Sequence, residues 1–168
     1  QVDAIGGRWC FHFGSAPAYT SAGCPAVSPA PSATQVIVVD AGDLLQGDPF
    51  AAYFAQVAPR DPNPIVDVMN QLGYDAATPG NHDFNFGVAT LKESLRRASF
   101  QVVSANIVGQ PSGEPMFLRQ AVLIRGGVRV GVTGFTTPGV MVWDRNNVRG
   151  QAQVQRIGAT APAELRRL

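Results

Sequence analysis

The sequence has little charge, few cysteines and no long apolar run, and the first and last of these shortages each exclude a class of protein or partner. Only 15% of the 168 residues are Asp, Glu, Lys or Arg, and the formal net charge is +1. A near-neutral chain carries no electrostatic signature of binding to a nucleic-acid polymer or a membrane surface. No apolar run approaches the roughly 20 residues with which a helix crosses a bilayer. The sequence therefore predicts neither a nucleic-acid polymer partner nor a membrane span, and it gives no sign of a protein partner.

The two cysteines of the chain, Cys10 and Cys24, both lie near its start. They could close one small disulfide loop in an oxidising compartment, or they could stay free, and two cysteines alone leave both states open. The sequence begins at Gln1 with neither a methionine nor an apolar leader. A signal peptide would therefore have been removed or never included.

Hydrophobic residues make up 45% of the sequence, which is enough for one globular domain with a core. Residues 1–34 carry only two charged side chains and end in a stretch rich in Pro, Ala and Ser. Such a composition predicts a flexible, extended segment. Residues 35–168 are expected to be the N-terminal part of a folded domain.

Strand and helix patterns alternate along the rest of the chain, as in an α/β fold. The β-branched run at 36–39 is typical of a strand that is buried on both faces. Apolar spacing predicts amphipathic helices near 64–72 and 88–98 on the outer face of a sheet. Adjacent glycines, Gly126 and Gly127, predict a hairpin turn. The strands expected to share the sheet are 36–40, 75–78, 101–107 and 128–134.

Two polar segments follow predicted strands, DAGDLLQG at 40–47 and GNHDFNFG at 80–87. Parallel strands bring such ends to the same edge of a sheet, which is where ligands bind in open α/β folds. The side chains gathered there would be Asp40, Asp43, Asn81 and His82. Oxygen donors with an imidazole suit Mn, Zn, Fe or Mg ions. Each segment alone is more often a turn or a helix cap, and spacing by itself leaves both interpretations open.

The segments GDLLQG and GNHDFNFG resemble two signature blocks of the calcineurin-like metallophosphoesterases, in their 5′-nucleotidase family. The resemblance covers about residues 35–168. Within the family, FNFG and PGVMVWDRNNVRG are similar to the bacterial 2′,3′-cyclic-nucleotide 2′-phosphodiesterase/3′-nucleotidases. The related thiosulfohydrolases carry Trp where His82 stands, which disfavours their chemistry. The resemblance implies an α/β fold that forms the front half of a four-layer α-β-β-α metallophosphoesterase sandwich.

The resemblance also implies a site with two divalent metal ions, for which Mn, Zn, Fe, Mg or Co are candidates. Asp43 would bridge the two ions, since each carboxylate oxygen can face one cation, and Asn81 would bind one of them. His82 would contact the phosphoryl oxygens and stabilise developing charge. Nucleotidases proper carry Asp three positions after this histidine, whereas Asn85 stands here and can hydrogen-bond without carrying charge. Asp83 is expected to be a structural carboxylate in the turn.

Parts of the family pattern are missing from these 168 residues. The family opens with an Asp-x-His block, and Asp3 and His12 do not have its spacing. A later Gly-His-x-His block is absent as well, and one carboxylate with one amide cannot hold two ions tightly. We therefore expect a domain truncated at both ends and inactive by itself, with no assignable substrate-binding residue. Trp143 and Asp144 belong to the family pattern, but packing and a turn account for them.

The leading hypothesis is metal-dependent hydrolysis of 2′,3′-cyclic nucleotides and 3′-nucleotides by a two-metal-activated water, in a periplasmic or secreted protein. One alternative is a 5′-nucleotidase or another phosphomonoesterase of the same superfamily. The other is a non-catalytic fragment that lacks the remaining metal ligands. A truncated sandwich would also leave apolar side chains of its inner sheet face in water, and such a surface promotes self-association.

Overall fold

The computed structural model describes residues 2–5, 8–11 and 35–166, which fall into two compact units, Gln1–Ile37 and Val38–Leu168. In the first unit, strands β1 (Val2–Ile5) and β2 (Arg8–Phe11) pair antiparallel, with Asp3 opposite Cys10. The predicted flexible segment 1–34 otherwise lies outside the described residues. His12 and Cys24 lie outside them too, so the pairing of the cysteines stays a prediction.

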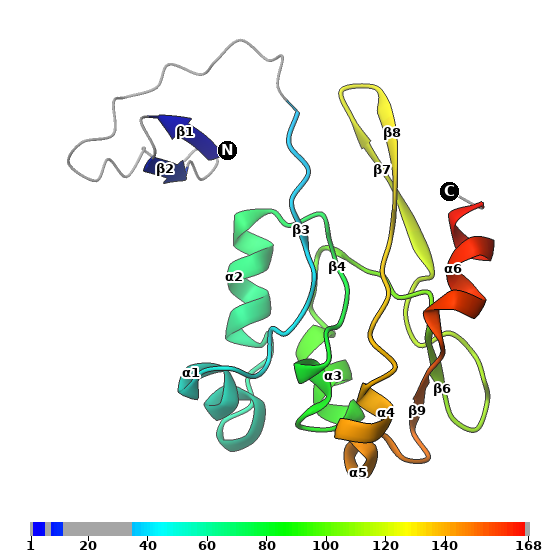
Figure 1. The fold of residues 1–168 in the computed structure, drawn as a ribbon. Helices are drawn as coiled ribbons and strands as arrows, with labels where there is room; N and C mark the ends of the chain where they lie inside the picture. The colour runs from blue at the N-terminus through cyan, green and yellow to red at the C-terminus, as the bar shows by residue number, and fades with distance from the viewer. Residues whose placement is uncertain (1, 6–7, 12–34, 167–168) are drawn as a thin grey trace. The chain divides into compact units, whose positions relative to one another are not determined.

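Three short parallel strands run through the second unit, and Figure 1 shows the first two of them side by side. These strands are β3 (Val39–Asp40), β4 (Ala76–Ala77) and β5 (Gln101–Val102), hydrogen-bonded in that order. Their parallel pairing confirms the predicted arrangement, but the strands are shorter than predicted. A side chain interrupts the ladder at one end, because the Val38 N–H donates to the Asp75 carboxylate at 2.9 Å.

The crossover from β3 to β4 contains the predicted helix α2 (Pro64–Leu72). It begins after Asn63, whose side-chain oxygen accepts the Ile65 N–H at 3.0 Å, and it ends at Gly73, whose φ is +72°. Asn63 and Gly73 are residue types that commonly cap the two ends of a helix. The short helix α1 (Pro49–Ala52) and the π-helix η1 (Tyr53–Val57) precede α2 and were not predicted.

The crossover from β4 to β5 contains a 3-10 turn, η2 (His82–Phe84), and helix α3 (Val88–Leu95). The helix ends before the predicted residue 98, because the chain continues in a tight turn in which the Ala98 N–H donates to the Leu95 carbonyl. The η2 turn follows β4 after residues 78–81, and it places Asp83 and Phe84 in the core, where both are buried.

Strands β7 (Gln120–Arg125) and β8 (Val128–Thr133) form the predicted hairpin. Its turn residues Gly126 and Gly127 have φ of +55° and +80°, values that glycine adopts without strain. The prediction that 128–134 joins the parallel sheet is wrong, because β8 makes its ladder bonds with β7 in a separate two-stranded sheet. Beyond the end of β8, the Gly134 carbonyl accepts one bond from the Ala105 N–H at 2.8 Å.

The predicted strand 101–107 is also divided. Its first part is β5, and its end belongs to β6 (Ile107–Gly109), which pairs antiparallel with β9 (Ala152–Val154). The side chain of Asn106, fully buried between the two parts, bonds the backbone of Thr136 and Gln155 and so replaces a strand ladder. The remaining elements are α4 (Val140–Trp143), α5 (Arg145–Val148) and the C-terminal helix α6 (Ile157–Leu165).

Two hydrophobic clusters hold the second unit together. In the smaller one, Val66 and Met69 of α2 pack with Ala77 of β4 and with Phe100. The larger one joins the two polar strand ends to the rest of the fold. Its buried members are Leu45, Phe84, Val88, Leu91, Ile107, Val140, Val148, Ala152 and Val154. Leu45 and Phe84 lie within the two polar segments that follow the strands. Core packing of these two residues therefore fixes the loops that carry them.

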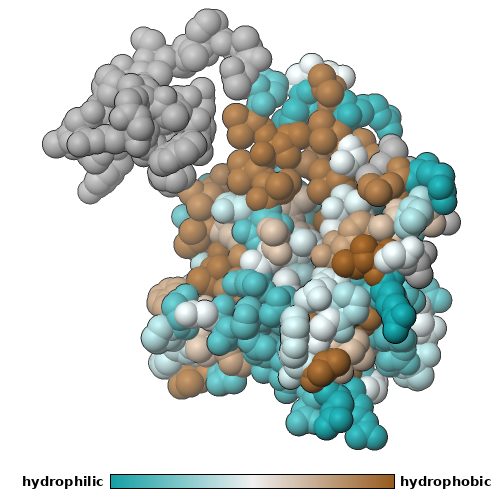
Figure 2. Space-filling model, viewed as in Figure 1, coloured by the Kyte–Doolittle hydropathy of each residue, from teal (hydrophilic) through white to brown (hydrophobic). Residues whose placement is uncertain are grey.

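Part of the apolar surface is exposed. Val39 is 54% exposed, and Ile124 and Val128 of the β7–β8 hairpin are 61% and 62% exposed. Figure 2 shows hydrophobic side chains gathered over the region where Figure 1 places this hairpin. Within the described ranges, none of the helices combines the length and apolar character that a membrane crossing requires.

Candidate functional site

The two polar strand ends meet in the structure. We call residues 41–47 the Asp43 loop and residues 78–85 the His82 turn. The two strands before them are neighbours, and the Thr78 N–H donates to the Asp40 carbonyl at 3.1 Å. Further on, the carboxylate of Asp43 accepts the backbone N–H of His82 at 2.9 Å. The structure therefore brings Asp43 and His82, 39 residues apart in sequence, to the same edge of the sheet, with Asn81 directly before His82.

Two glycines permit this close approach. A Cβ atom on Gly42 would lie 2.0 Å from the Gly80 backbone nitrogen, and one on Gly80 would lie 2.2 Å from Asp43 Oδ1. Both distances are far below a van der Waals contact, and Gly42 also has a φ of +94°. The two loops can therefore touch only because neither position carries a side chain.

Asp43 itself has an unusual backbone conformation. Its φ of +64° is the one positive value at a non-glycine residue in the described part of the chain. Such a conformation costs roughly 1–3 kcal/mol and persists where the surroundings determine it, often at functional sites. The surroundings here include a bond from the Asp43 N–H to the Asp83 carboxylate at 2.9 Å. The side chain that this backbone presents is exposed.

Asp83 joins the two loops from beneath. Its carboxylate is 1% exposed and accepts four backbone N–H groups. They belong to Asp43 at 2.9 Å, Leu44 at 2.7 Å, Leu45 at 2.9 Å and Gly80 at 2.8 Å. Burial raises the pKa of the Asp83 carboxyl above its ordinary value, and the four donors oppose that shift. This geometry supports the predicted structural role of the residue.

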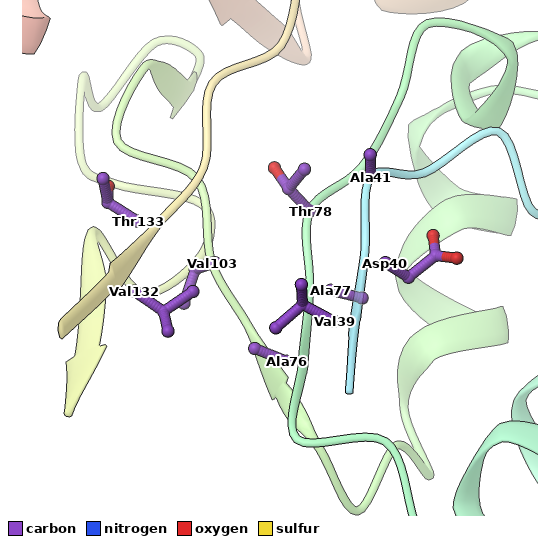
Figure 3. A pocket seen from close by; sticks show the side chains of 9 residues that line it. All are labelled: Val39, Asp40, Ala41, Ala76, Ala77, Thr78, Val103, Val132 and Thr133. Atoms are coloured by element: carbon purple, nitrogen blue, oxygen red, sulfur yellow. The ribbon is translucent and has the colours of Figure 1, made fainter. Parts of the chain in front are cut away.

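Of the remaining predicted residues, Asn81 lies directly before His82 and is half-buried. The Asp40 carboxylate accepts the Gly42 N–H at 2.6 Å, and in Figure 3 it points away from Val103 and Val132. Asp40 therefore shapes the turn at the start of the Asp43 loop. It does not share the contact between Asp43 and His82.

A metal site can be assembled only in part from these donors. Asp43 and Asn81 supply oxygen atoms of the kind that hard divalent cations prefer, on two loops in direct contact. Among the described residues, no group of three or more His, Cys, Asp and Glu side chains is arranged to hold an ion. The donor set therefore fits one side of a divalent cation site and leaves the other side to be supplied by further ligands.

His82 is the start of a polar chain that sequence reasoning missed in part. Its Nδ1 atom lies 2.9 Å from Asn85 Oδ1, and the Asn85 amide nitrogen donates to the Asp144 carboxylate at 2.8 Å. Asn147 donates to the Asn85 carbonyl at 2.9 Å. Asp144 lies between α4 and α5, in a turn as predicted. The segment DRNN has the composition of a turn, so it carries no sequence signal of this contact.

A separate hollow of about 260 Å³ lies on the face of the sheet. Figure 3 shows its lining, which is Val39, Asp40, Ala41, Ala76, Ala77, Thr78, Val103, Val132 and Thr133. Asp43, Asn81 and His82 are not part of this lining. The hollow is mostly apolar and reaches the two loops only at Ala41 and Thr78, so we do not regard it as the catalytic candidate.

The chain is similar to known phosphoesterases. No protein-family model matches it. It is 40% identical over 140 residues to the trifunctional nucleotide phosphoesterase protein YfkN of Bacillus subtilis, which covers 74% of this chain and 10% of that protein. It is 39% identical over 142 residues to the 2′,3′-cyclic-nucleotide 2′-phosphodiesterase/3′-nucleotidase of Yersinia enterocolitica, which covers 77% of this chain and 22% of that protein.

Solved structures agree with the sequence relatives. The calcineurin-like phosphoesterase YfkN from Bacillus subtilis superposes with a TM-score of 0.70 at 37% identity, over 78% of this chain and 43% of that one. The 5′-nucleotidase precursor from Thermus thermophilus superposes with a TM-score of 0.64 at 32% identity, over 81% of this chain and 26% of that one. The chain thus spans a small part of its relatives. It belongs to the 5′-nucleotidase family of calcineurin-like phosphoesterases, as the resemblance of its two strand-end segments implied.

Proposed function

We propose that the complete protein carrying this sequence hydrolyses phosphoester bonds of nucleotides with the help of two divalent metal ions. The observation that carries the proposal is the contact between the Asp43 loop and the His82 turn. It places an exposed carboxylate beside the backbone of an exposed histidine, over a buried clamp that fixes both. Relatives named as nucleotide phosphoesterases and nucleotidases support the same reaction class.

In this proposal Asp43 and Asn81 are metal ligands. Their oxygen atoms suit Mn, Zn, Fe, Mg or Co, and the exposed Asp43 carboxylate has two oxygens with which to bridge two ions. When bound, such ions activate the attacking water and neutralise charge on the phosphoryl group. The remaining ligands must come from residues other than the described ones, because the described ones supply too few.

His82 and Asn85 are the proposed catalytic pair. His82 is exposed beside the metal ligands, where its imidazole can donate to a phosphoryl oxygen and stabilise the charge that develops there. It can also protonate the leaving alkoxide. Asn85, bonded to His82 Nδ1 at 2.9 Å, holds the ring in place.

We further propose 2′,3′-cyclic nucleotides and 3′-nucleotides as substrates. The similarity to the Yersinia protein supports them, as does the resemblance of the segment in which Asp144 and Asn147 contact Asn85. A 5′-nucleotidase is the alternative, supported by the Thermus structure. Phosphate release from 2′,3′-cyclic AMP, 3′-AMP and 5′-AMP, with Mn²⁺ present, separates the two. Preference for 5′-AMP would select the alternative, and no release from any of the three would overturn the enzyme proposal.

A non-catalytic role for these 168 residues alone is a second candidate, because the described donors complete no metal site. Calorimetry with Mn²⁺ tests it directly. Weak or absent binding by the 168-residue chain, together with tight binding by the complete protein, is the expected result. Tight binding of two ions by the short chain would contradict it.

The proposed architecture is a four-layer α-β-β-α sandwich, with residues 35–168 as part of its catalytic domain and residues 1–34 as a flexible segment. The boundary between the two compact units, at Ile37 and Val38, lies close to the proposed one. The exposed hairpin side chains Ile124 and Val128 support a covering layer. Without such a layer the 168-residue chain should associate with itself and bind a hydrophobic dye.

Replacing both exposed residues, Ile124→Thr with Val128→Thr, should reduce the dye binding and the association measured by sedimentation. Val142→Thr is the control, because Val142 is 75% exposed on α4, outside the hairpin. A monodisperse unmodified chain with a sharp thermal transition would contradict the missing layer.

A periplasmic or secreted location is proposed from the family resemblance, and cell fractionation of the native host protein tests it.

A further inference from the structure

A continuous polar chain runs from the exposed imidazole of His82 into the interior of the fold. Asn85 lies next to the imidazole, and the carboxylate of Asp144 lies behind Asn85. Asp144 is 5% exposed, whereas His82 is exposed. A negatively charged group thus stands one residue away from the proposed catalytic histidine, on a segment 59 residues further along the chain than Asn85.

The hydrogen-bonding capacities of the groups allow one orientation of the central amide. An ionised carboxylate and a backbone carbonyl oxygen can only accept hydrogen bonds. Asn85 must therefore turn its NH₂ group toward Asp144, 2.8 Å away, and its Oδ1 atom then faces His82 at 2.9 Å. Because Oδ1 can only accept, the proton between Asn85 and His82 must sit on the imidazole Nδ1.

A second amide holds the Asn85 backbone and the Asp144 carboxylate together. Asn147 donates to the backbone carbonyl of Asn85 at 2.9 Å and to Asp144 Oδ1 at 3.2 Å. Two amide NH₂ groups thus converge on one buried carboxylate oxygen, and rotation of the Asn85 side chain would turn its amide oxygen toward that carboxylate in place of a donor. Loss of a hydrogen bond to a buried charged group costs more free energy than loss of a bond to an exposed group. The network therefore favours a single arrangement.

We propose that Asp144 is a positioning residue that fixes the tautomer of His82 through Asn85. The carboxylate orients the amide, the amide holds the proton on Nδ1, and Nε2 is left to exchange a proton with the substrate. This inference rests on the proposed function for its catalytic consequence, and on geometry alone for the tautomer.

The proposal makes a specific prediction about exchanging the two side chains. Asn85→Asp alone places two carboxylates in contact, and Asp144→Asn alone removes the group that orients Asn85. The double variant Asn85→Asp with Asp144→Asn restores one carboxylate and one amide in reversed order. The carboxylate at position 85 can then accept from His82 Nδ1 and from the amide behind it.

The first measurement is steady-state hydrolysis of 2′,3′-cyclic AMP by the complete protein with Mn²⁺. Each single variant should lower kcat by about 10–100-fold with a much smaller change in KM, as loss of an outer partner of a site residue typically does. The double variant should recover most of that loss. Asp67→Asn is the matched control, since Asp67 lies on α2 and its side chain accepts only from Gln71 among the bonds described. A double variant as slow as the product of the singles would overturn the proposal and make Asp144 a purely structural residue.

The second measurement needs no activity. Selective ¹⁵N labelling of histidine in the complete protein, with His82→Gln to assign the signal, reports which ring nitrogen carries the proton. We expect the Nδ1–H form in the unmodified protein and a mixture in Asp144→Asn. A proton on Nε2 in the unmodified protein overturns the inference, whatever the catalytic result. If no nucleotide is hydrolysed while the Nδ1–H form is found, the proposed function fails and the positioning network stands.

Discussion

The backbone N–H of His82 donates to the side chain of Asp43 at 2.9 Å. This bond connects the residue proposed to hold the metals with the residue proposed to meet the phosphoryl group. It also joins two loops that leave neighbouring parallel strands. Any change that separates the loops should therefore disturb metal binding and substrate positioning together, whereas a change confined to one side chain should affect one of them.

Asp83→Asn should destabilise the fold. The carboxylate accepts four buried N–H groups, two on each oxygen, and an amide nitrogen in place of one oxygen leaves two of them facing a donor. A buried donor without a partner costs about 1–3 kcal/mol, so a loss of about 2–4 kcal/mol in the free energy of unfolding is expected. Urea unfolding with Asp67→Asn as the control measures it, and amide exchange should be faster at Leu44 and Gly80. A loss no larger than the control's would show that the clamp is dispensable.

Gly80→Ala should weaken metal binding and lower activity together. The added Cβ would lie 2.2 Å from Asp43 Oδ1, so the carboxylate must move away from the His82 N–H. We expect weaker Mn²⁺ binding by the complete protein in calorimetry, together with lower activity. Gly158→Ala is the matched control, because the same added atom there meets nothing within 4 Å. Unchanged affinity in Gly80→Ala would mean that Asp43 does not need this position to bind metal.

His82→Asn in the complete protein should lower kcat by about 10²–10³, the usual effect of removing one donor that stabilises a transition state. Its metal content, measured by elemental analysis, should stay near that of the unmodified protein. Asp43→Asn provides the contrast, since it should lose metal along with activity. Loss of bound metal in His82→Asn would instead make the imidazole a ligand.

The acid limit of stability should depend on Asp61. Hydrogen bonds from Arg97 and Arg96 hold the pKa of this carboxyl below its ordinary value of 3.8. A folded-state pKa below the unfolded one gives stability that is present above about pH 4 and is lost as the pH falls through the folded pKa. Unfolding midpoints measured from pH 6 down to pH 2 should therefore fall less steeply in Asp61→Asn. Parallel curves for the two proteins would contradict this, and high salt should reduce any difference because the pair is exposed.

Local patterns in the sequence account for much of the fold. Three local patterns each predict an element that forms. They are the β-branched run, the apolar spacing between Pro64 and Gly73, and the paired glycines of the hairpin. The alternation of strands and helices then fixes the parallel order of β3, β4 and β5. The family's signature segments place Asp43 and His82 at one edge.

Contacts between distant segments account for what the sequence did not reveal. The strand predicted at 101–107 is interrupted because the Asn106 side chain bonds the backbone of Thr136 and Gln155, 30 and 49 residues away. The bond from Asn85 to Asp144 spans 59 residues. A polar residue that satisfies a distant backbone or amide group has the same local signature as one in an exposed turn, so composition and periodicity cannot separate them.

The clamp formed by Asp83 has a consequence for how this sequence can vary. The carboxylate holds residues 43–45 and residue 80 directly, so the distance between the two loops does not depend on the length of the chain that connects them. The connection runs through α1, η1 and the exposed residues near Arg60 before it reaches α2. Insertions near Arg60 can enlarge this crossover, and add new surface to the protein, without changing the spacing of the proposed metal ligands.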